Sequence, residues 1–460
     1  MISVVLLILF GVACVWLIVD GLKRRGGIFE FSFLAGCGLF GFLFTEAVGV
    51  VRSPGIAPEA GVCKALIMST LCALAVYFGW KAPVRPRRTA SPRSPFPLKP
   101  IYWCGVACII VGTVGFVKLA GLTGGVTQFY SVHGSYTLKY QGLPVAYLFF
   151  VMYSYLGFVL VTLIALRLRF WLLLVPAAVP LAMLLANVVF LGRRMEFVWL
   201  TLVSGTLLYF ARDLAPPRAV VLALAPLAMA AMFVAPAYRA HSEIGGDWAR
   251  ARQDLSSDAV HQVLSGATTE FWSMSYLIEI ADTQNLYQFG VGFYNVFVNV
   301  FVPKLIVGEE FKAKLFVDVP SAATAANRFG WVFPYSMSPT GPYSVFSQFW
   351  YFGASCVYFL ARWLRKHWVR ALEGDMWSQA VYSLAVIYAV NAVVSDFFAI
   401  YLPVFMFILP MMALNRLLAL LRQVGGPYCY PTPLRSWPHS RASSPASRLR
   451  AARTKAPPDV

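Results

Sequence analysis

The sequence predicts an all-α fold, a polytopic membrane helix bundle with about eleven transmembrane helices and one large loop. Composition is the first reason. The 460 residues are 59% hydrophobic and only 13% charged, with a mean hydropathy of +0.67, whereas soluble domains are about 25% charged. So few charges cannot cover the surface of a globule of this size, and the apolar excess must therefore face lipid. The second reason is that the apolar residues gather into runs of bilayer length.

Apolar runs long enough to cross a bilayer recur along most of the chain. The runs lie at 2–20, 28–50, 62–80, 101–120, 144–166, 170–191, 195–211, 219–236, 343–361, 376–394 and 399–418. The first run is followed by Lys23, Arg24 and Arg25, whereas a secretory signal carries its positive charges before the apolar core. We therefore expect the first run to be a membrane anchor.

Basic residues are distributed unequally between alternate loops, which predicts the orientation of the chain. The richer set of loops carries Lys23, Arg24, Arg25, Lys81, Arg85, Arg87, Arg88, Arg93, Lys99, Arg167, Arg169, Arg212, Arg218, Arg362, Arg365, Lys366 and Arg370. The opposite short loops carry Arg52, Lys64, Lys118, Lys139, Arg193 and Arg194. Because cytoplasmic loops retain Lys and Arg, the N-terminus is expected outside and the C-terminus inside.

The pattern divides the chain into four regions. Residues 1–236 hold helices one to eight, 237–342 form a large outer loop, 343–420 hold helices nine to eleven, and 421–460 form a disordered basic cytoplasmic tail. Within the loop, the apolar stretch 290–307 is about one bilayer length at most. We interpret it as an interfacial or re-entrant helix rather than as a twelfth span.

The charge and cysteine content exclude several other classes of protein. The net charge of +18 is explained by basic loops that face the cytoplasm and meet anionic lipid headgroups, so nucleic acid is not an expected partner, whereas membrane lipid is. The eight cysteines form no CxxC pair, and no HExxH pattern occurs. They are interpreted as small apolar residues, and the sequence predicts neither a metal site nor a cofactor.

Two basic motifs lie at outer ends of predicted spans. Gly192-Arg193-Arg194 ends the sixth span, where two arginines oppose the charge bias and offer guanidinium forks that suit phosphate. The alternative is that they extend to lipid phosphates at the interface. Arg239 and His241 follow the eighth span and could bind phosphate and transfer a proton. The alternative is an ordinary polar helix end.

Three further sets of residues in or after the loop could act on a substrate. Tyr287 and Lys304 lie at the two ends of an aromatic stretch. This stretch could stack on sugar rings or anchor the chain at the membrane interface. Tyr343 follows Thr340-Gly341-Pro342, which is interpreted first as a turn into a helix. Glu270 precedes Phe271 and Trp272, apolar neighbours that would raise its pKa towards that of a general base. The alternative for Glu270 is a solvated carboxylate.

These motifs, in this order and on this side of the membrane, resemble those of the oligosaccharide repeat-unit polymerases (the Wzy-type, O-antigen polymerase family). The resemblance covers most of the chain and rests on Gly192-Arg193-Arg194, Tyr238-Arg239, Pro303-Lys304, Thr340-Gly341-Pro342-Tyr343 and Phe352-Gly353. Two segments depart from the family pattern: Gly341-Pro342-Tyr343, where many relatives have Gly-Glu-x-Tyr, and Lys312-Ala313-Lys314, where many have Lys-Pro.

The resemblance implies a glycosyltransferase of the bacterial inner membrane, with the outer loop in the periplasm. Its substrate would be an undecaprenyl-pyrophosphate-linked oligosaccharide, polymerised into a surface or exopolysaccharide without a metal ion. A chain-length regulator and a flippase are candidate partners. Arg193, Arg194 and Arg239 are expected to bind the leaving pyrophosphate. The general base is expected to be His241 or Glu270.

Two other functions stay open at this point. An O-antigen ligase would use a similar site but transfer the glycan to lipid A core. A polytopic flippase or transporter would move a lipid-linked sugar without forming a bond. A transporter should place its charges along a central cavity, whereas this sequence keeps most ionisable residues at the ends of its predicted spans.

Overall fold

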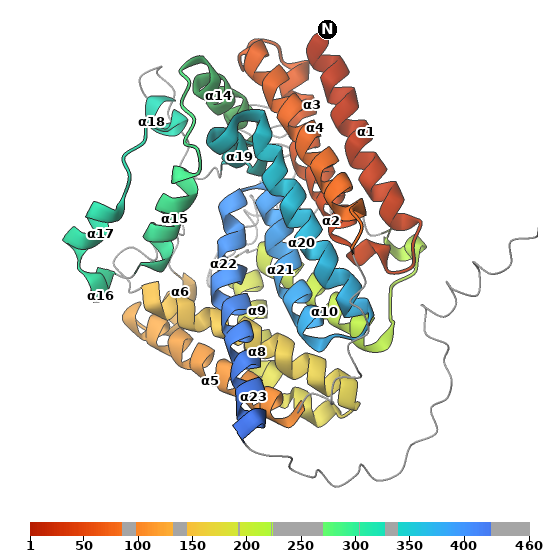
Figure 1. The fold of residues 1–460 in the computed structure, drawn as a ribbon, viewed down its shortest axis with the longest axis vertical. Coiled ribbons are helices and arrows are strands. Elements are labelled where there is room, and N and C mark those ends of the chain that lie inside the picture. Colours follow the sequence, from red (N-terminus) through yellow and green to blue (C-terminus); the bar gives the residue numbers. More distant parts are fainter. Residues whose placement is uncertain are drawn as a thin grey trace, which may run out of the picture. The chain divides into compact units, whose positions relative to one another are not determined.

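A computed structural model of the chain describes residues 1–84, 98–131, 145–191, 194–221, 223, 270–302, 304–326 and 339–424. Helices joined by turns form this described part, which contains no strand (Figure 1). Met1–Pro410 form one compact unit, and a second begins at Met411. The all-α polytopic bundle predicted from the sequence is confirmed.

Eight segments of the described chain are long and apolar enough to cross a membrane. They are Ile2–Leu22, Phe31–Arg52, Glu59–Lys81, Leu98–Leu122, Phe149–Leu168, Trp171–Phe190, Met376–Val394 and Phe397–Leu417. Each matches one of the eleven predicted runs. Of the other three runs, 195–211 is the less apolar helix α10, 219–236 lies mostly outside the described residues, and 343–361 is broken. The total of eleven stays a prediction.

The helices used below have the following bounds. The first half of the chain contains α1 (Ile2–Leu22), α2 (Phe31–Gly38), the π-helical η2 (Leu39–Phe44), α3 (Thr45–Arg52), α4 (Glu59–Lys81), α5 (Leu98–Leu122), α6 (Val126–Ser131), α8 (Val145–Leu168), η3 (Trp171–Ala177), α9 (Ala178–Leu191) and α10 (Arg194–Arg212). The second half contains α14 (Glu270–Thr283), α15 (Val291–Phe301), α16 (Lys304–Val307), α17 (Glu309–Leu315), α18 (Ala322–Ala326), α19 (Gly341–Phe349), η5 (Trp350–Gly353), α20 (Ala354–Leu372), α21 (Met376–Val394), η6 (Phe397–Ile400), α22 (Tyr401–Pro403), the π-helical η7 (Val404–Ile408) and α23 (Leu409–Val424).

Small residues let α5 and α8 pack closely. A Cβ added at Gly112 would lie 2.6 Å from the backbone nitrogen of Ser154, and one at Gly157 would lie 2.5 Å from the carbonyl oxygen of Gly105. Small residues at such crossings are typical of membrane helices, because close backbone approach increases van der Waals contact. The glycines therefore fix how these two spans meet.

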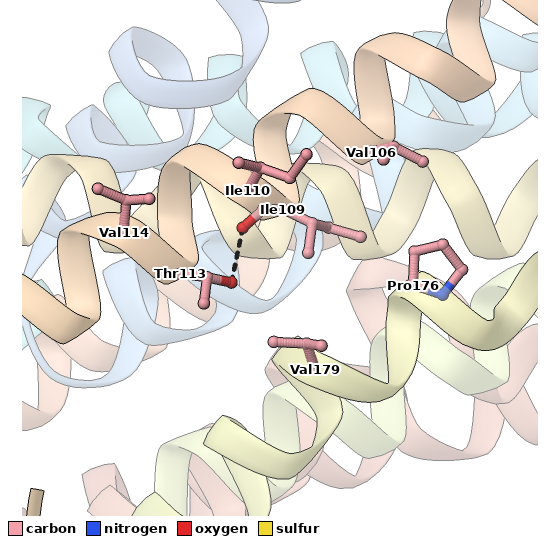
Figure 2. A pocket seen from close by; sticks show the side chains of 7 residues that line it. All are labelled: Val106, Ile109, Ile110, Thr113, Val114, Pro176 and Val179. Carbon is pink, nitrogen blue, oxygen red and sulfur yellow. Dashed lines mark hydrogen bonds between the residues drawn. The ribbon is translucent and has the colours of Figure 1, made fainter.

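A groove between α5 and the η3–α9 segment is lined by apolar side chains. Figure 2 shows the lining residues, which are Val106, Ile109, Ile110, Thr113, Val114, Pro176 and Val179. The one hydroxyl among them, on Thr113, donates to the carbonyl oxygen of Ile109 in its own helix, at 2.8 Å. The groove thus presents a hydrocarbon surface, as expected for a segment that faces lipid.

The loops predicted to be cytoplasmic meet at one end of the bundle. Lys81 contacts Asp20 at 2.9 Å, and Arg25 contacts Asp213 at 3.5 Å. Arg218 donates to the carbonyl oxygen of Lys23. Further contacts at this end are Arg24 with Glu30, Trp80 with Glu30, Arg365 over the ring of Trp80, and Arg167 with the carbonyl of Gly374. The alternation of loops predicted from charge thus agrees with these contacts.

Segments from the opposite loops meet at the other end, which we call the outer end after the charge prediction. The indole N–H of Trp272 donates to the carbonyl oxygen of Ile56 at 2.6 Å. The backbone N–H of Phe271 donates to Glu46. The hydroxyl of Ser344 donates to Asp396. These contacts join the α3–α4 turn, α14, α19 and the α21–η6 turn, as the contacts among these elements also show.

Of two predicted segments of the second half, one differs in the structure and the other has the expected length. The run 343–361 is not one helix, because the backbone of Trp350 has φ = +55° and the chain passes through η5 before α20 begins at Ala354. The stretch 290–307 contains α15, which has eleven residues. About twenty are needed to span a bilayer, so α15 has the length expected of an interfacial or re-entrant helix.

The orientation itself stays a prediction, which reporter fusions would test. Fusions after residue 90 and after residue 425 are expected to report the cytoplasm, and a fusion near residue 260 the periplasm, because cytoplasmic loops retain Lys and Arg. The measurement is reporter activity from each fusion in whole cells. A periplasmic signal after residue 90 would contradict the topology.

Candidate functional site

A cation and two carboxylates lie at the outer end between α4 and α14. The ammonium of Lys64 is 2.9 Å from a carboxylate oxygen of Glu279 and 2.6 Å from one of Asp282. The three side chains are 23%, 25% and 27% exposed, so the group is half-buried and reachable from solvent. Glu279 and Asp282 are three residues apart on α14 and so share one face of that helix.

Tyr287 extends this group toward the turn between α14 and α15. Its hydroxyl donates to Asp282 at 2.5 Å. Burial alone would raise the pKa of Asp282, but the hydrogen bonds from Lys64 and Tyr287 hold it below its ordinary value. The pKa of Tyr287 is raised above its ordinary value by burial and by its bond to Asp282. Asp282 is therefore a carboxylate, and Tyr287 a protonated donor, at neutral pH.

Two turns from distant parts of the chain are joined beside this group. The backbone N–H of Gln288 donates to the carbonyl oxygen of Ser347, and that of Phe289 donates to the carbonyl of Gln348, both at 2.9 Å. The buried side chain of Gln348 accepts from the N–H groups of Gly290 and Gly292. The first N–H groups of a helix have no carbonyl partner within the helix. Gln348 provides an acceptor for two such groups at the start of α15.

Backbone strain and exposed aromatic rings occur together in the two joined turns. Phe289 and Trp350 have φ of +47° and +55°, values that are costly for residues other than glycine. Their side chains are 76% and 43% exposed, and that of Phe352 is 75% exposed. We name the exposed rings of Phe289, Trp350 and Phe352, with the adjacent Tyr287 and Tyr351, the aromatic patch. Neighbouring rings of the patch have centroids 4.9–6.5 Å apart. The ring of Phe346 lies between those of Tyr287 and Tyr351 and connects them.

The segment Thr340-Gly341-Pro342-Tyr343 begins α19, as the sequence interpretation of a turn into a helix predicted. The side chain of Thr340 accepts from the N–H of Tyr343 and so caps the helix. A side chain at Gly341 would collide with the backbone carbonyls of Ala392 and Val393. Only glycine allows α19 to approach the end of α21 this closely, and this approach positions the turn that carries Trp350.

Asp396 is enclosed where α19 meets the end of α21. Its carboxylate accepts from the hydroxyl of Ser344 at 3.0 Å and from the N–H of Phe398 at 3.1 Å. Burial raises the pKa of Asp396 to about 6, and these two hydrogen bonds lower it only in part. The ionised form is therefore destabilised at neutral pH.

Replacing Asp396 with asparagine is expected to stabilise the protein at pH 7.5 by about 2 kcal/mol and not at pH 4. The raised pKa means that the folded chain binds this proton more tightly than the unfolded chain, whose Asp has a pKa near 3.9. Stability is therefore lost as pH rises from about 4 to about 6. Asparagine keeps the acceptor for Ser344. The measurement is the melting temperature in detergent against pH, with the exposed Asp318→Asn as control. An equal gain at both pH values would contradict the assignment.

Helix α15 packs an aromatic face against the last span. Phe293, Phe297 and Phe301 are four residues apart and share one face. Phe293 lies 5.7 Å from Phe397 and 5.1 Å from Phe398, and Phe301 lies 4.5 Å from Phe405, between ring centroids. These contacts hold α15 along the outer part of the bundle, with its start at the aromatic patch.

The predicted site residues that the structure describes lie on different elements. Tyr287 lies in the aromatic patch, Tyr343 is buried in α19, and Glu270 is the first residue of α14. Lys304 is exposed at the start of α16, after α15. Arg194 is the first residue of α10, and its side chain is not described. Arg193, Arg239 and His241 lie outside the described residues.

Sequence reasoning did not single out the residues that hold the site together. Lys64 was named only as one of the basic residues of the opposite short loops, and Glu279 and Asp282 were not named among the candidate site residues. Their spacing of three residues on an apolar helix was a usable signal. Gln348 gave none, because its partners Gly290 and Gly292 are more than fifty residues away in the chain.

The outer end thus combines aromatic faces, carboxylates, a cation and backbone turns, all of which suit a polar ligand with apolar ring faces. Aromatic rings offer stacking surfaces, and ionised carboxylates accept strong hydrogen bonds from hydroxyl groups. Among the described residues, no group of three or more side chains is placed to bind a metal ion. Neither a known family, nor a curated protein, nor a solved structure matches the chain. The functional argument therefore rests on the site.

Proposed function

We propose that the chain polymerises undecaprenyl-pyrophosphate-linked oligosaccharide repeat units into a surface or exopolysaccharide. It would act as a metal-independent glycosyltransferase at the periplasmic face of the bacterial inner membrane. One observation carries the proposal. Two strained turns are joined at the outer end of a membrane bundle and present exposed aromatic rings directly beside the half-buried Lys64, Glu279 and Asp282.

The composition of this site suits a sugar. A pyranose has an apolar face of C–H groups, which packs on aromatic rings such as those of Trp350 and Phe289. Its hydroxyl groups donate to carboxylates such as Asp282, and its ring and hydroxyl oxygens accept from cations such as Lys64. Strained backbone persists where the surroundings hold it in place, which is often at ligand sites. Phe289 and Trp350 meet this description.

The position of the site suits a lipid-linked sugar in particular. Spans on either side of the site, α4 and α21, are apolar enough to lie in a bilayer. A glycan attached to a membrane lipid would thus meet the aromatic patch at the height where its lipid anchor enters the membrane. The arginines predicted to bind the pyrophosphate, Arg193, Arg194 and Arg239, stay the expected partners of that group.

The reaction needs three contributions from the protein. A hydroxyl of the incoming repeat unit attacks the anomeric carbon of the growing chain, and the bond from that carbon to the pyrophosphate oxygen breaks. Cations stabilise the charge that develops on the leaving pyrophosphate. A base removes the hydroxyl proton, for which His241 and Glu270 were the expected candidates. Binding of both glycans in register provides the orientation.

The two alternatives differ in what they require. A flippase needs charges along a path through the bilayer, whereas the ion pairs among the described residues lie at the two ends of the bundle. That distribution favours chemistry at one surface. A ligase would use the same kind of site for a different acceptor, so the distinction between polymerase and ligase depends on the product.

A strain that lacks this chain distinguishes the three functions by its surface glycan. Loss of a polymerase is expected to leave a single repeat unit attached at the surface, loss of a ligase to leave none, and loss of a flippase to trap units inside the cell. The measurement is the size of surface glycan on a gel, with the chain supplied on a plasmid as control. A surface with normal long polymer in the deletion strain would contradict all three.

A further inference from the structure

A second polar group lies where α10 begins, directly after the Arg193-Arg194 pair. The hydroxyl of Tyr155, on α8, donates to one carboxylate oxygen of Glu196 at 2.6 Å. The side-chain amide of Asn187, on α9, lies 3.4 Å from the other oxygen. The hydroxyl of Tyr130, on α6, donates to the amide oxygen of Asn187 at 3.2 Å. Side chains of α8 and α9 thus contact the carboxylate of α10, and Tyr130 of α6 holds Asn187 from behind.

A buried donor beside this carboxylate adds a second, independent observation. Trp199 follows Glu196 by three residues on α10 and therefore shares its helix face. Its side chain is 4% exposed, and its ring lies edge-on to that of Tyr155 at 4.7 Å. Its indole N–H has no hydrogen-bond partner among the described residues. A buried donor left in this way costs about 1–3 kcal/mol, which points to an acceptor group on a ligand.

The place of this carboxylate in its helix is informative. Glu196 lies in the first turn of α10, at the start of the predicted span 195–211, where the positive end of the helix dipole stabilises an acidic side chain. It is half-buried rather than sealed, so a ligand can reach it.

We propose that Glu196 is the proton acceptor for the attacking sugar hydroxyl, with Tyr155 and Asn187 holding its carboxylate in place. This inference rests on the proposed function and assigns a role that His241 and Glu270 were expected to fill. The hydroxyl proton passes to Glu196 as the oxygen bonds to the anomeric carbon. The bond between that carbon and the pyrophosphate oxygen breaks, and the pyrophosphate leaves with the electron pair. Glu196 then releases its proton to solvent.

The position of Glu196 favours a role as proton acceptor over a role in holding the helices together. Glu196 comes two residues after Arg194, so it sits at the start of the helix whose first residues are expected to bind the pyrophosphate. Tyr155 donates at 2.6 Å and fixes one oxygen, as a positioned base requires. The indole of Trp199 lies on the same helix face and could donate to a sugar or phosphate oxygen.

The test uses the purified full chain in detergent, with the undecaprenyl-pyrophosphate-linked single repeat unit as substrate. Glu196→Gln is expected to lower kcat by about 10²-fold or more, the effect of losing a general base, and to change KM little. Tyr155→Phe is expected to lower kcat by about tenfold, because one bond that positions the base is lost. Two controls, Tyr153→Phe on the same helix and the exposed Glu373→Gln, should keep wild-type turnover.

A rescue experiment separates a chemical role from a structural one. Added formate is expected to restore part of the turnover of Glu196→Ala, because it supplies a carboxylate in the space of the lost side chain, and to leave Glu270→Ala unchanged. Wild-type turnover in Glu196→Gln, or no rescue of a folded Glu196→Ala, would overturn the assignment of Glu196 while the wild-type chain still makes polymer. If the wild-type chain makes no polymer, the proposed function fails instead.

Discussion

Replacing Arg193 and Arg194 together with alanine is expected to abolish long polymer while the abundance of the protein stays near normal. The leaving group is a pyrophosphate at the membrane surface, and its developing charge has to be met by cations there. Guanidinium groups bind phosphate through two parallel hydrogen bonds. Lysine offers a point charge without that fork, so the double lysine variant is expected to rescue polymer poorly.

The arginine pair is tested in the deletion strain, with each variant supplied on a plasmid. The measurement is the size distribution of surface glycan together with the amount of protein in the membrane fraction. Arg52→Ala is the matched control, because Arg52 is an exposed arginine that belongs to the same set of loops by charge pattern and has no proposed role. Full-length polymer from the double alanine variant would rule out a binding role for the pair.

Replacing Lys64 with methionine is expected to lower the free energy of unfolding by about 2 kcal/mol. The substitution leaves Glu279 and Asp282 on one helix face without the ammonium that lies 2.9 and 2.6 Å from them. An exposed pair would contribute less than about 1 kcal/mol and a buried pair broken on one side about 3–5 kcal/mol. These side chains are about one-quarter exposed, which places the expected effect between those limits.

A compensated variant shows whether the loss comes from charge. Adding Glu279→Gln and Asp282→Asn to Lys64→Met is expected to recover most of the stability, because the neutral amides repel each other less than two carboxylates. The measurement is denaturant unfolding in detergent, and methionine at the exposed Lys118 is the control. A triple variant less stable than Lys64→Met alone would show that the three side chains contribute through packing rather than charge.

The spans could be predicted from the sequence because each is a local property. The apolar residues of a run such as 2–20 or 62–80 are enough to predict that it lies in a membrane. The basic residues of alternate loops predict which ends of the spans lie on the same side. The break in the helix at Trp350 could not be predicted in this way. Its left-handed backbone is normally signalled by glycine or asparagine, whereas the sequence there is Phe-Trp-Tyr-Phe.

The candidate site was predictable only in part, because its contacts join distant segments. Tyr287 and Tyr343 could be selected as aromatic residues near turns. The bond of Gln348 to Gly290 and that of Tyr155 to Glu196 connect residues 58 and 41 positions apart, and no local pattern reports such pairs. Glu196 was not selected for the same reason, although it follows Arg193 and Arg194 by two to three residues.

The most direct test of the central claim is an assay with the purified full chain and one defined substrate. The chain is incubated with an undecaprenyl-pyrophosphate-linked repeat unit, with and without a metal chelator, and the products are separated by size. Polymerisation predicts a ladder of glycans that differ by one repeat unit, with release of undecaprenyl pyrophosphate and no effect of the chelator. Recovery of the repeat unit intact, or transfer of single units only when lipid A core is added, would contradict the proposed function.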